Sequence, residues 1–222
     1  MFDNIAPRYD LLNHTLTLGL DYGWRRKAVQ MLAKYKPRVI VDMATGTADF
    51  AIEAARLNPE KIIGIDISPQ MLGIGREKVS KRNLSSLIEL IEGDSEAINL
   101  PDNSVDAITV GFGVRNFEHL TQGMSELLRI LRPGGAVVIL EPASPRHFPM
   151  KQLFELNFRV ITPLVGRLLS GDSSAYTYLP ASVQAFPYGE EFLSICREVG
   201  FVRTSFRTLG LGVCACYLIE KP

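Results

Sequence analysis

The sequence has little that would bind a metal ion or a polyanion. Of its 222 residues, three are cysteine and three are histidine, and 24 basic residues balance 24 acidic ones. A chain without net charge has no bulk attraction to nucleic acid. The longest apolar run, near residues 136–140, is far shorter than the roughly 20 residues of a membrane span. The start also lacks the basic and apolar regions of a signal peptide, so we expect a cytoplasmic protein.

The cysteines and histidines follow no metal-ligand pattern. Cys196, Cys214 and Cys216 form no C-x-x-C pair, and the last two are spaced to point to one face of a strand. This favours core packing in a reducing compartment over a disulfide or a metal site. His119 and His147 also lack suitably spaced partners. We therefore predict no metal.

The sequence does contain a strand, turn, helix and strand that together predict a nucleotide-type site. An apolar strand over 39–43 leads into a turn around Gly46, and a second apolar strand ends at Asp66. Asp66 follows Gly46 by 20 residues. That is about where a Rossmann-type unit places the acid that binds a ribose. The spacing predicts a cofactor that contains adenosine.

The composition of this turn separates the candidate cofactors. A nicotinamide or flavin site needs three glycines near its pyrophosphate, whereas here Ala44 and Ala48 flank the single Gly46. S-adenosylmethionine (SAM) has no phosphates, and a turn with Thr45 and Asp42 suits its zwitterionic part better. An ordinary strand-to-helix turn remains the alternative, because a lone glycine motif is weak evidence.

Strand and helix patterns alternate between residues 39 and 141. Strands are predicted over 39–43, 61–66, 87–92, 105–112 and 136–141, and helices over 48–57, 69–82 and 120–131, followed by a turn at 132–135. Alternation of this kind predicts a parallel sheet with right-handed crossovers. A helix over 190–199 and two strands over 202–207 and 212–219 would complete a class I methyltransferase fold, with seven strands and an antiparallel last strand.

Two segments outside this core are predicted to lie near the substrate. The chain is divided as a helical cap over 1–37, the core over 38–141, an insertion over 142–185, and a helix with a hairpin over 186–222, all in one domain. In the cap, Asp21 is expected to cap a helix over 22–36. The apolar stripe over 150–169 indicates either a plain core helix or a lid for an apolar substrate or the membrane surface.

Several motifs together resemble the ubiquinone/menaquinone biosynthesis C-methyltransferases. They are Ala-Pro-Arg-Tyr-Asp at 6–10, Trp-Arg-Arg at 24–26, Asp-Met-Ala-Thr-Gly-Thr-Ala-Asp at 42–49, Gly-Val-Arg-Asn at 113–116, Leu-Arg-Pro-Gly-Gly at 131–135 and Tyr-Thr-Tyr-Leu-Pro-Ala-Ser at 176–182. The resemblance implies methyl transfer from SAM to a ring carbon of a polyprenylated quinol. The menaquinone members are the more similar, which implies demethylmenaquinol as the acceptor.

The resemblance also implies which residues contact the cofactor. They are Thr47 after the turn glycine, Asp66 on the ribose, and Asp94 with Ser95 near the adenine, and we add Asp42, Gly46 and Gly111 to this site. Asp94 has an alternative use, because aspartate often caps a turn in a loop. The sequence departs from the family at Gly111, where many members have serine, and at Asp21, where parts of the family have histidine.

Catalytic candidates follow the fourth predicted strand and lie in the cap. A quinol carbon becomes nucleophilic once a ring hydroxyl loses its proton, so the site needs a base and a partner for the oxyanion. We expect Arg115 to stabilise the quinolate or orient a water, and Asn116 to fix a ring hydroxyl. Arginine stays protonated and is not the base. Tyr9 and His14 are candidate partners, although a structural role for His14 is an open alternative.

Three other activities remain alternatives on sequence alone. In the first, the enzyme methylates a benzoquinol of ubiquinone synthesis. In the second, the chain is a SAM-binding module without catalysis, and in the third it is an NAD-dependent reductase. The expected partner is a polyprenylated naphthoquinol, and nucleic acid is not expected. A peripheral contact with the inner face of the membrane and a homodimer are kept open.

Overall fold

The computed structural model describes residues 6, 10, 11, 14, 15, 17–143, 145, 152 and 181–222. Apart from residue 152, the predicted stripe over 150–169 lies outside the described residues, as do the block at 176–180 and Tyr9. Everything below concerns the described part of the chain.

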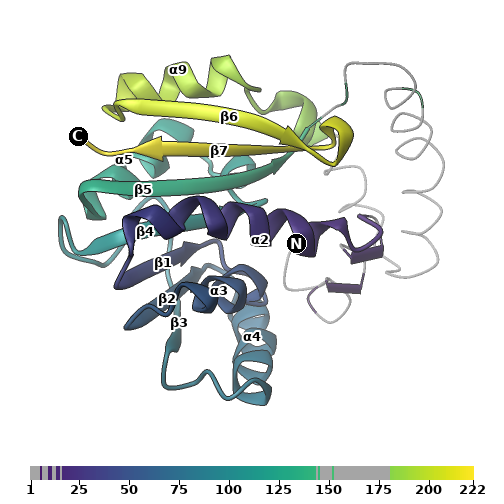
Figure 1. Ribbon diagram of the computed structural model, residues 1–222, viewed down its shortest axis with the longest axis vertical. Coiled ribbons are helices and arrows are strands. Elements are labelled where there is room, and N and C mark those ends of the chain that lie inside the picture. The colour runs from purple at the N-terminus through teal and green to yellow at the C-terminus, as the bar shows by residue number, and fades with distance from the viewer. Residues whose placement is uncertain are drawn as a thin grey trace.

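A seven-stranded sheet forms the centre of the molecule (Figure 1). The strands lie in the order β3-β2-β1-β4-β5-β7-β6. Their bounds are β1 Val39–Met43, β2 Lys61–Asp66, β3 Ile88–Glu92, β4 Val105–Gly111, β5 Leu131–Pro142, β6 Arg203–Leu209 and β7 Cys214–Glu220. The first five strands pair in parallel, and β7 pairs antiparallel with both β5 and β6. This is the predicted class I methyltransferase topology.

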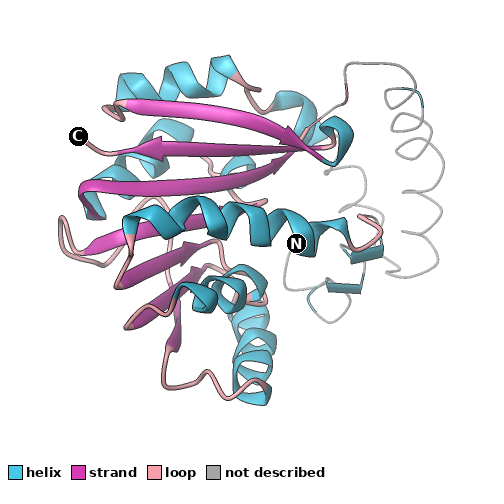
Figure 2. Ribbon diagram, in the orientation of Figure 1, coloured by secondary structure: helices cyan, strands magenta, loops and turns pink. Residues whose placement is uncertain are grey.

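Helices cover both faces of the sheet (Figure 2). They are α2 Leu20–Leu32, α3 Asp49–Ala54, α4 Pro69–Lys81, α5 Leu120–Ile130 and α9 Glu190–Val199, with short 3-10 helices after α2 and α3. The buried side chains of α2, α3 and α4 form one apolar cluster with the sheet, and those of α5 and α9 form the other. The central strands are apolar throughout because helices bury both of their faces.

Neighbouring residues of one strand therefore belong to different layers. In β1, Ile40 packs with the α2 layer and Val41 with the α5 layer, and both are fully buried. A one-residue slip in register would turn each side chain of the strand to the opposite face of the sheet. Because both faces are buried, the register is fixed, and the carboxyl ends of β1, β2 and β4 lie level at one edge. That edge carries the site.

Predicted bounds agree with the structure to within a few residues, with two exceptions. The residues predicted as a turn at 132–135 belong to β5, because Leu131 already pairs with Val105 before a shift in register. Asp21 does not cap α2: the helix begins at Leu20 after Gly19, whose φ is 73°, and Asp21 lies buried in the first turn. Its carboxylate is used by other side chains, described below.

The three cysteines are free and buried, as predicted. Burial raises the pKa of the Cys196 thiol to about 12 and that of Cys216 to about 11, so both thiols are neutral packing groups. Among the described helices, none is long and apolar enough to cross a bilayer.

Candidate functional site

A pocket opens at the carboxyl ends of β1, β2, β3 and β4, where ligands bind in open α/β sheets. Its lining includes Gly46 from the β1 turn, Asp66 at the end of β2, Asp94 and Ser95 after β3, and Asn116 after β4. Gly111 also lines it, through backbone atoms alone. The structure thus brings six of the predicted site residues together around one cavity.

Close packing between two loops shapes the floor of this pocket. A Cβ atom added to Gly113, in the loop after β4, would lie 2.5 Å from the Cβ of Ala44 in the turn after β1. The preceding Phe112 adopts φ 59° and also lines the pocket. Glycine at 113 is therefore required by the close approach of the two loops.

Asp66 organises the turn as well as facing the pocket. Its Oδ2 accepts a hydrogen bond from the backbone N–H of Gly46 at 2.7 Å, and its Oδ1 accepts one from Ser68 at 2.9 Å. The side chain thereby ties the end of β2 to the β1 turn. A carboxylate fixed in this way at the pocket wall is suitably placed to accept hydrogen bonds from a ribose diol.

Asp94 has the turn-capping use considered for it from the sequence, and it lies at the pocket. Its Oδ1 accepts a hydrogen bond from the backbone N–H of Glu96 at 2.9 Å, which is the turn-capping use, while the residue also lines the pocket beside Ser95. Gly93 precedes them against the side chain of Ile65. The turn therefore fixes the carboxylate of Asp94 at the pocket.

The charges of the lining select among adenosine cofactors. Its ionisable residues are Asp66, Asp94, Glu96 and Glu118, and within the described residues it includes no lysine or arginine. The phosphates of a dinucleotide would face these carboxylates without a cation, whereas SAM carries a sulfonium and an ammonium group. Apolar side chains, among them Ile67 and Met71, supply flat contact for a base. The residues present therefore fit SAM.

Two predicted cofactor residues do not line the pocket. Asp42 is fully buried beneath the turn, where its carboxylate accepts hydrogen bonds from the hydroxyls of Thr45 at 2.5 Å and Thr109 at 2.6 Å and from the N–H of Ala51 at 3.0 Å. Burial raises the pKa of Asp42 to about 6. Asp42 therefore supports the turn from below. The predicted direct contact between Asp42 and the cofactor is corrected accordingly.

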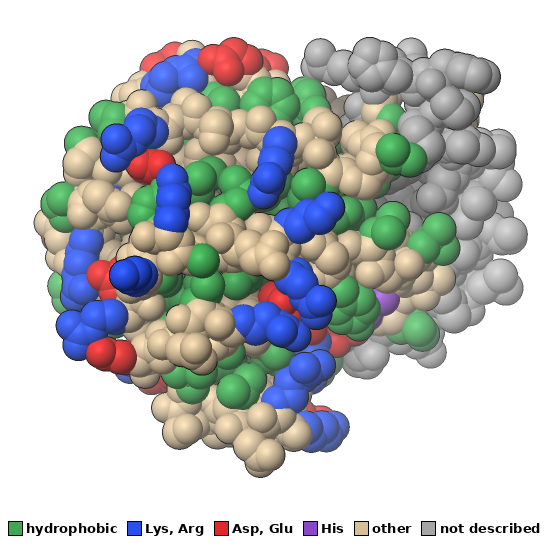
Figure 3. Space-filling model, viewed as in Figure 1, with side chains coloured by type: hydrophobic (Ala, Val, Ile, Leu, Met, Phe, Trp, Pro, Cys, Tyr) green, Lys and Arg blue, Asp and Glu red, His purple; other side chains and the backbone are tan. Residues whose placement is uncertain are grey.

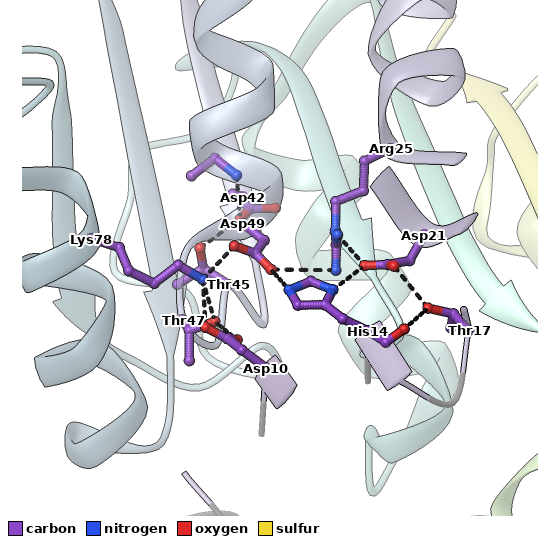
Figure 4. A network of polar contacts seen from close by, with 11 residues as sticks. Asp10, His14, Thr17, Asp21, Arg25, Asp42, Thr45, Thr47, Asp49 and Lys78 are labelled. Atoms are coloured by element: carbon purple, nitrogen blue, oxygen red, sulfur yellow. Dashed lines mark hydrogen bonds and ion pairs between the residues drawn. The ribbon is translucent and has the colours of Figure 1, made fainter. Parts of the chain in front are cut away.

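Thr47 is the second of these residues, and it is tied to the cap. Its hydroxyl donates to Asp10 Oδ1 at 2.5 Å, and the side chain is almost fully buried. The ammonium of Lys78, on α4, lies 2.8 Å from Asp10 Oδ2 and 3.0 Å from the Thr47 hydroxyl, and it also binds Asp49. Lys78 thus joins the cap, the turn and the start of α3 (Figure 4).

His14 belongs to the other half of this network. Its Nδ1 lies 2.7 Å from Asp21 Oδ2, and its Nε2 lies 3.4 Å from Asp49 Oδ2. Arg25 contacts the same two carboxylates, at 2.6 Å and 3.6 Å. The ring of Tyr22 stacks on the imidazole, with centroids 4.4 Å apart. Both ring nitrogens of His14 therefore face carboxylates, and the residue does not line the pocket.

The network holds its three carboxylates by ion pairing. Asp10, His14 and Asp49 place possible ligand atoms within 4.8 Å of one another. Lys78 already binds both of these carboxylates, and Arg25 lies on Asp49. Two cations, Lys78 and Arg25, and the imidazole of His14 thus contact the carboxylates of Asp10, Asp21 and Asp49.

Arg115 lies behind the pocket loop in a buried ion pair. Its Nη1 donates to Glu141 Oε2 at 3.0 Å and to the carbonyl of Phe112, and its backbone N–H lies 3.3 Å from Glu141 Oε1. Burial raises the pKa of the fully buried Glu141, and the charge of Arg115 opposes that rise. Within the described chain, Nε of Arg115 is a buried donor with no partner. Asn116, one residue on, does line the pocket.

Reasoning from sequence missed Lys78, Asp10 and Glu141. Asp10 belongs to the Ala-Pro-Arg-Tyr-Asp motif at 6–10, which indicated the family but no contact for its side chain. Glu141 ends an otherwise apolar strand, which was a signal that its charge needs a buried partner. No feature of the neighbouring sequence indicated a role for Lys78, because a lysine on an amphipathic helix is usually solvent-exposed.

Comparison with known sequences agrees with this geometry. Residues 1–221 match the model of the ubiE/COQ5 methyltransferase family. The chain is 51% identical over its whole length to 91% of a demethylmenaquinone methyltransferase from Bacteroides fragilis. It is 46% identical, with the same coverage, to a demethylmenaquinone methyltransferase from Deinococcus radiodurans. It is also 42% identical over its whole length to 87% of a ubiquinone/menaquinone biosynthesis C-methyltransferase from Geobacter sulfurreducens.

Solved structures show the same fold at low sequence identity. The structure of a SAM-dependent methyltransferase from Thermotoga maritima matches 100% of this chain and 98% of its own chain, with a TM-score of 0.68 and 19% identity. A second, from Methanococcus maripaludis, covers 100% of the chain and 94% of its own, with a TM-score of 0.69 and 20% identity. The predicted fold and the predicted SAM-dependent methyltransferase activity are both confirmed. The chain belongs to the ubiE/COQ5 methyltransferase family.

Proposed function

We propose that this protein transfers a methyl group from SAM to a ring carbon of demethylmenaquinol, giving menaquinol in the last step of menaquinone synthesis. The observation that supports it most is the full-length identity, 51% and 46%, to two proteins named demethylmenaquinone methyltransferase. The acidic pocket, which suits a cationic cofactor without phosphates, is consistent with the same proposal.

The acceptor enters beside the loop after β4 in this proposal. SAM supplies an activated methyl group, so the protein must hold the nucleophilic carbon in line with that methyl at about 3–3.5 Å. Asn116 lines the pocket, and its amide lies 3.4 Å from the carbonyl of Phe112, which orients it. We assign it the task of fixing one quinol hydroxyl. Phe112 and Phe117, also in the lining, supply apolar walls for an aromatic ring.

Arg115 is assigned to the charge that develops on the deprotonated quinol. Its guanidinium is held by Glu141 and by the Phe112 carbonyl, and among the described residues its Nε has no acceptor. A cation held by a buried carboxylate stabilises a quinolate mainly through its position and its field. Because arginine does not release its proton, the proton passes to a water or to another group. Tyr9 remains a candidate for that group.

The assay compares acceptors directly. Purified protein is incubated with methyl-labelled SAM and short-chain quinols that differ only in the ring. We expect label in the demethylnaphthoquinol and little in the matching benzoquinol. Equal labelling of both rings would support the second candidate function, and the Geobacter sulfurreducens relative, named for both pathways, favours testing it. No label in either quinol would contradict both.

A polyprenylated acceptor resides in a bilayer, so the proposal includes a peripheral contact between the protein and the membrane. The homodimer suggested from sequence stays a prediction.

A further inference from the structure

Exposed apolar side chains gather at the end of the molecule where the pocket opens. Leu18 and Leu20, at the start of α2, are 85% and 51% exposed, and Tyr22 is 55% exposed. Leu211, in the turn between β6 and β7, is 78% exposed. Its neighbour Gly210 lies against the ring of Trp24, one turn further along α2. We call Leu18, Leu20, Tyr22 and Leu211 the apolar edge.

A basic surface continues from this edge over α2, the 3-10 helix Ala33–Tyr35 that follows it, and β6. Its members are Arg26, Lys27, Lys34, Arg203 and Arg207, all of them exposed. Contacts place α2 and β6 on one face: Cys216 of β7 touches Met31 of α2 at 3.6 Å, and Arg207 is the residue directly opposite Cys216 in the sheet, on the same face. Figure 3 shows Lys and Arg side chains spread across this face. We call these five residues the basic face.

The basic face carries more positive than negative charge. The acid of α2, Asp21, is 1% exposed, and β6 contains none. Glu220 is largely buried and is shared by Lys34 and Arg203, while Glu53 is shared by Arg26 and Arg56. Lys27 and Arg207 take part in no ion pair within the described chain. Two acids thus face at least five cations, although the whole chain has no net charge.

We propose that the apolar edge and the basic face form a docking surface for an anionic phospholipid bilayer. Leucine and tyrosine side chains would enter the interface while lysine and arginine contact lipid phosphates, which is how amphipathic surfaces bind membranes. The edge lies at the carboxyl ends of the parallel strands, the same end as the pocket (Figure 1). A quinol leaving the bilayer would therefore meet the pocket opening. This inference rests on the proposed acceptor being a membrane lipid.

Vesicle flotation with the full chain tests the proposal. Vesicles are made of phosphatidylcholine with or without phosphatidylglycerol. We expect binding to the anionic vesicles only, and loss of binding at high salt because surface charges are then screened. Lys27→Glu and Arg207→Glu should each lower the affinity at least about fivefold, the effect of one basic residue near an anionic membrane. Leu18→Ser combined with Leu211→Ser should lower it about tenfold or more, since the apolar contact is lost.

Lys81→Glu is the matched control, because Lys81 is 76% exposed on α4, outside both surfaces, and undergoes the same change of charge. Its affinity for vesicles should equal that of the wild type. Equal affinity in all variants, or no wild-type binding to anionic vesicles, would overturn the proposal. So would a wild-type dimer that the leucine substitutions dissociate, because the edge would then be an interface between two copies.

An activity assay without vesicles separates this proposal from the proposed function. Methylation of a short-chain quinol in water should be unchanged in the docking variants, since none of their residues lines the pocket. Failure of the wild type in that assay would contradict the acceptor, whatever the vesicles show. Normal activity in water with equal vesicle binding by all variants would contradict the docking surface alone.

Discussion

Arg115 and Glu141 form a buried ion pair behind the pocket, with Nη1 and Oε2 3.0 Å apart and side chains 8% and 1% exposed. Removing one partner of such a pair leaves an uncompensated buried charge. We expect Glu141→Leu to lower the free energy of unfolding by about 3–5 kcal/mol, measured by urea denaturation. Arg115→Met removes the charge that is assigned to the quinolate, so we expect kcat to fall about a hundredfold or more. If that variant retained full kcat, the assigned stabilisation of the quinolate would be wrong.

The ribose contact of Asp66 predicts a specific loss of cofactor affinity. Asp66→Asn keeps oxygen and nitrogen atoms in the turn but removes the charge, and a hydrogen bond to a charged group contributes about 1.5–3 kcal/mol. Titration calorimetry should show SAM binding weakened about 10- to 100-fold. The control is Asp102→Asn, on an aspartate that is 69% exposed and outside the pocket. Unchanged SAM affinity in Asp66→Asn would contradict the assignment.

Buried Asp42 predicts a pH dependence of stability. Its pKa is raised from 3.8 to about 6 by burial, so the folded state binds a proton more tightly than the unfolded state does. The contribution of this group is therefore present below about pH 4 and is lost as the pH rises through about 6, amounting to roughly 3 kcal/mol. Asp42→Asn should remove this part of the pH profile. The free energy of unfolding of both proteins is measured by urea denaturation at pH 4 and at pH 7. If the difference between wild type and Asp42→Asn were the same at both pH values, this prediction would be wrong.

Lys78 is expected to support cofactor binding through Thr47 and Asp49 without touching the cofactor. Its side chain is 21% exposed. Lys78→Met leaves two partly buried carboxylates without their shared cation, and solvent screening limits the cost to about 1–2 kcal/mol of stability. SAM affinity should fall with it, and Lys78→Arg should restore part of both. The same substitution at Lys81, one turn along α4, is the control. Wild-type melting and SAM affinity in Lys78→Met would refute this role.

His14 tests whether the cap supplies the base. Loss of a general base typically costs about 10²–10⁴ in rate. Because both imidazole nitrogens face carboxylates, at 2.7 Å and 3.4 Å, we expect a structural role and a kcat within about threefold of wild type for His14→Gln. A hundredfold drop with an altered pH–rate profile would instead restore His14 as the proton acceptor.

The sequence by itself predicted the sheet, its strands and the pocket edge. Apolar runs that are buried on both faces have a clear signature, and the carboxyl ends of parallel strands must meet at one edge. Gly46, Asp66 and Asp94 follow those ends, so their meeting at the pocket was predictable. The acceptor was predicted from the family resemblance, because no residue spacing in the sequence indicates which quinol ring is bound.

Only the tertiary structure decided which charged residues touch the pocket and which support it. Asp42, near the end of β1, and Thr47, in the turn with Gly46, lie next to the pocket in sequence, yet their side chains contact Thr109 and Asp10 instead. Those partners are 67 and 37 residues away in the chain. The pairing of Lys78 with the cap likewise depends on how α4 packs. Ion pairs between elements far apart in the chain form only where folding brings those elements together, and no local spacing in the sequence marks them.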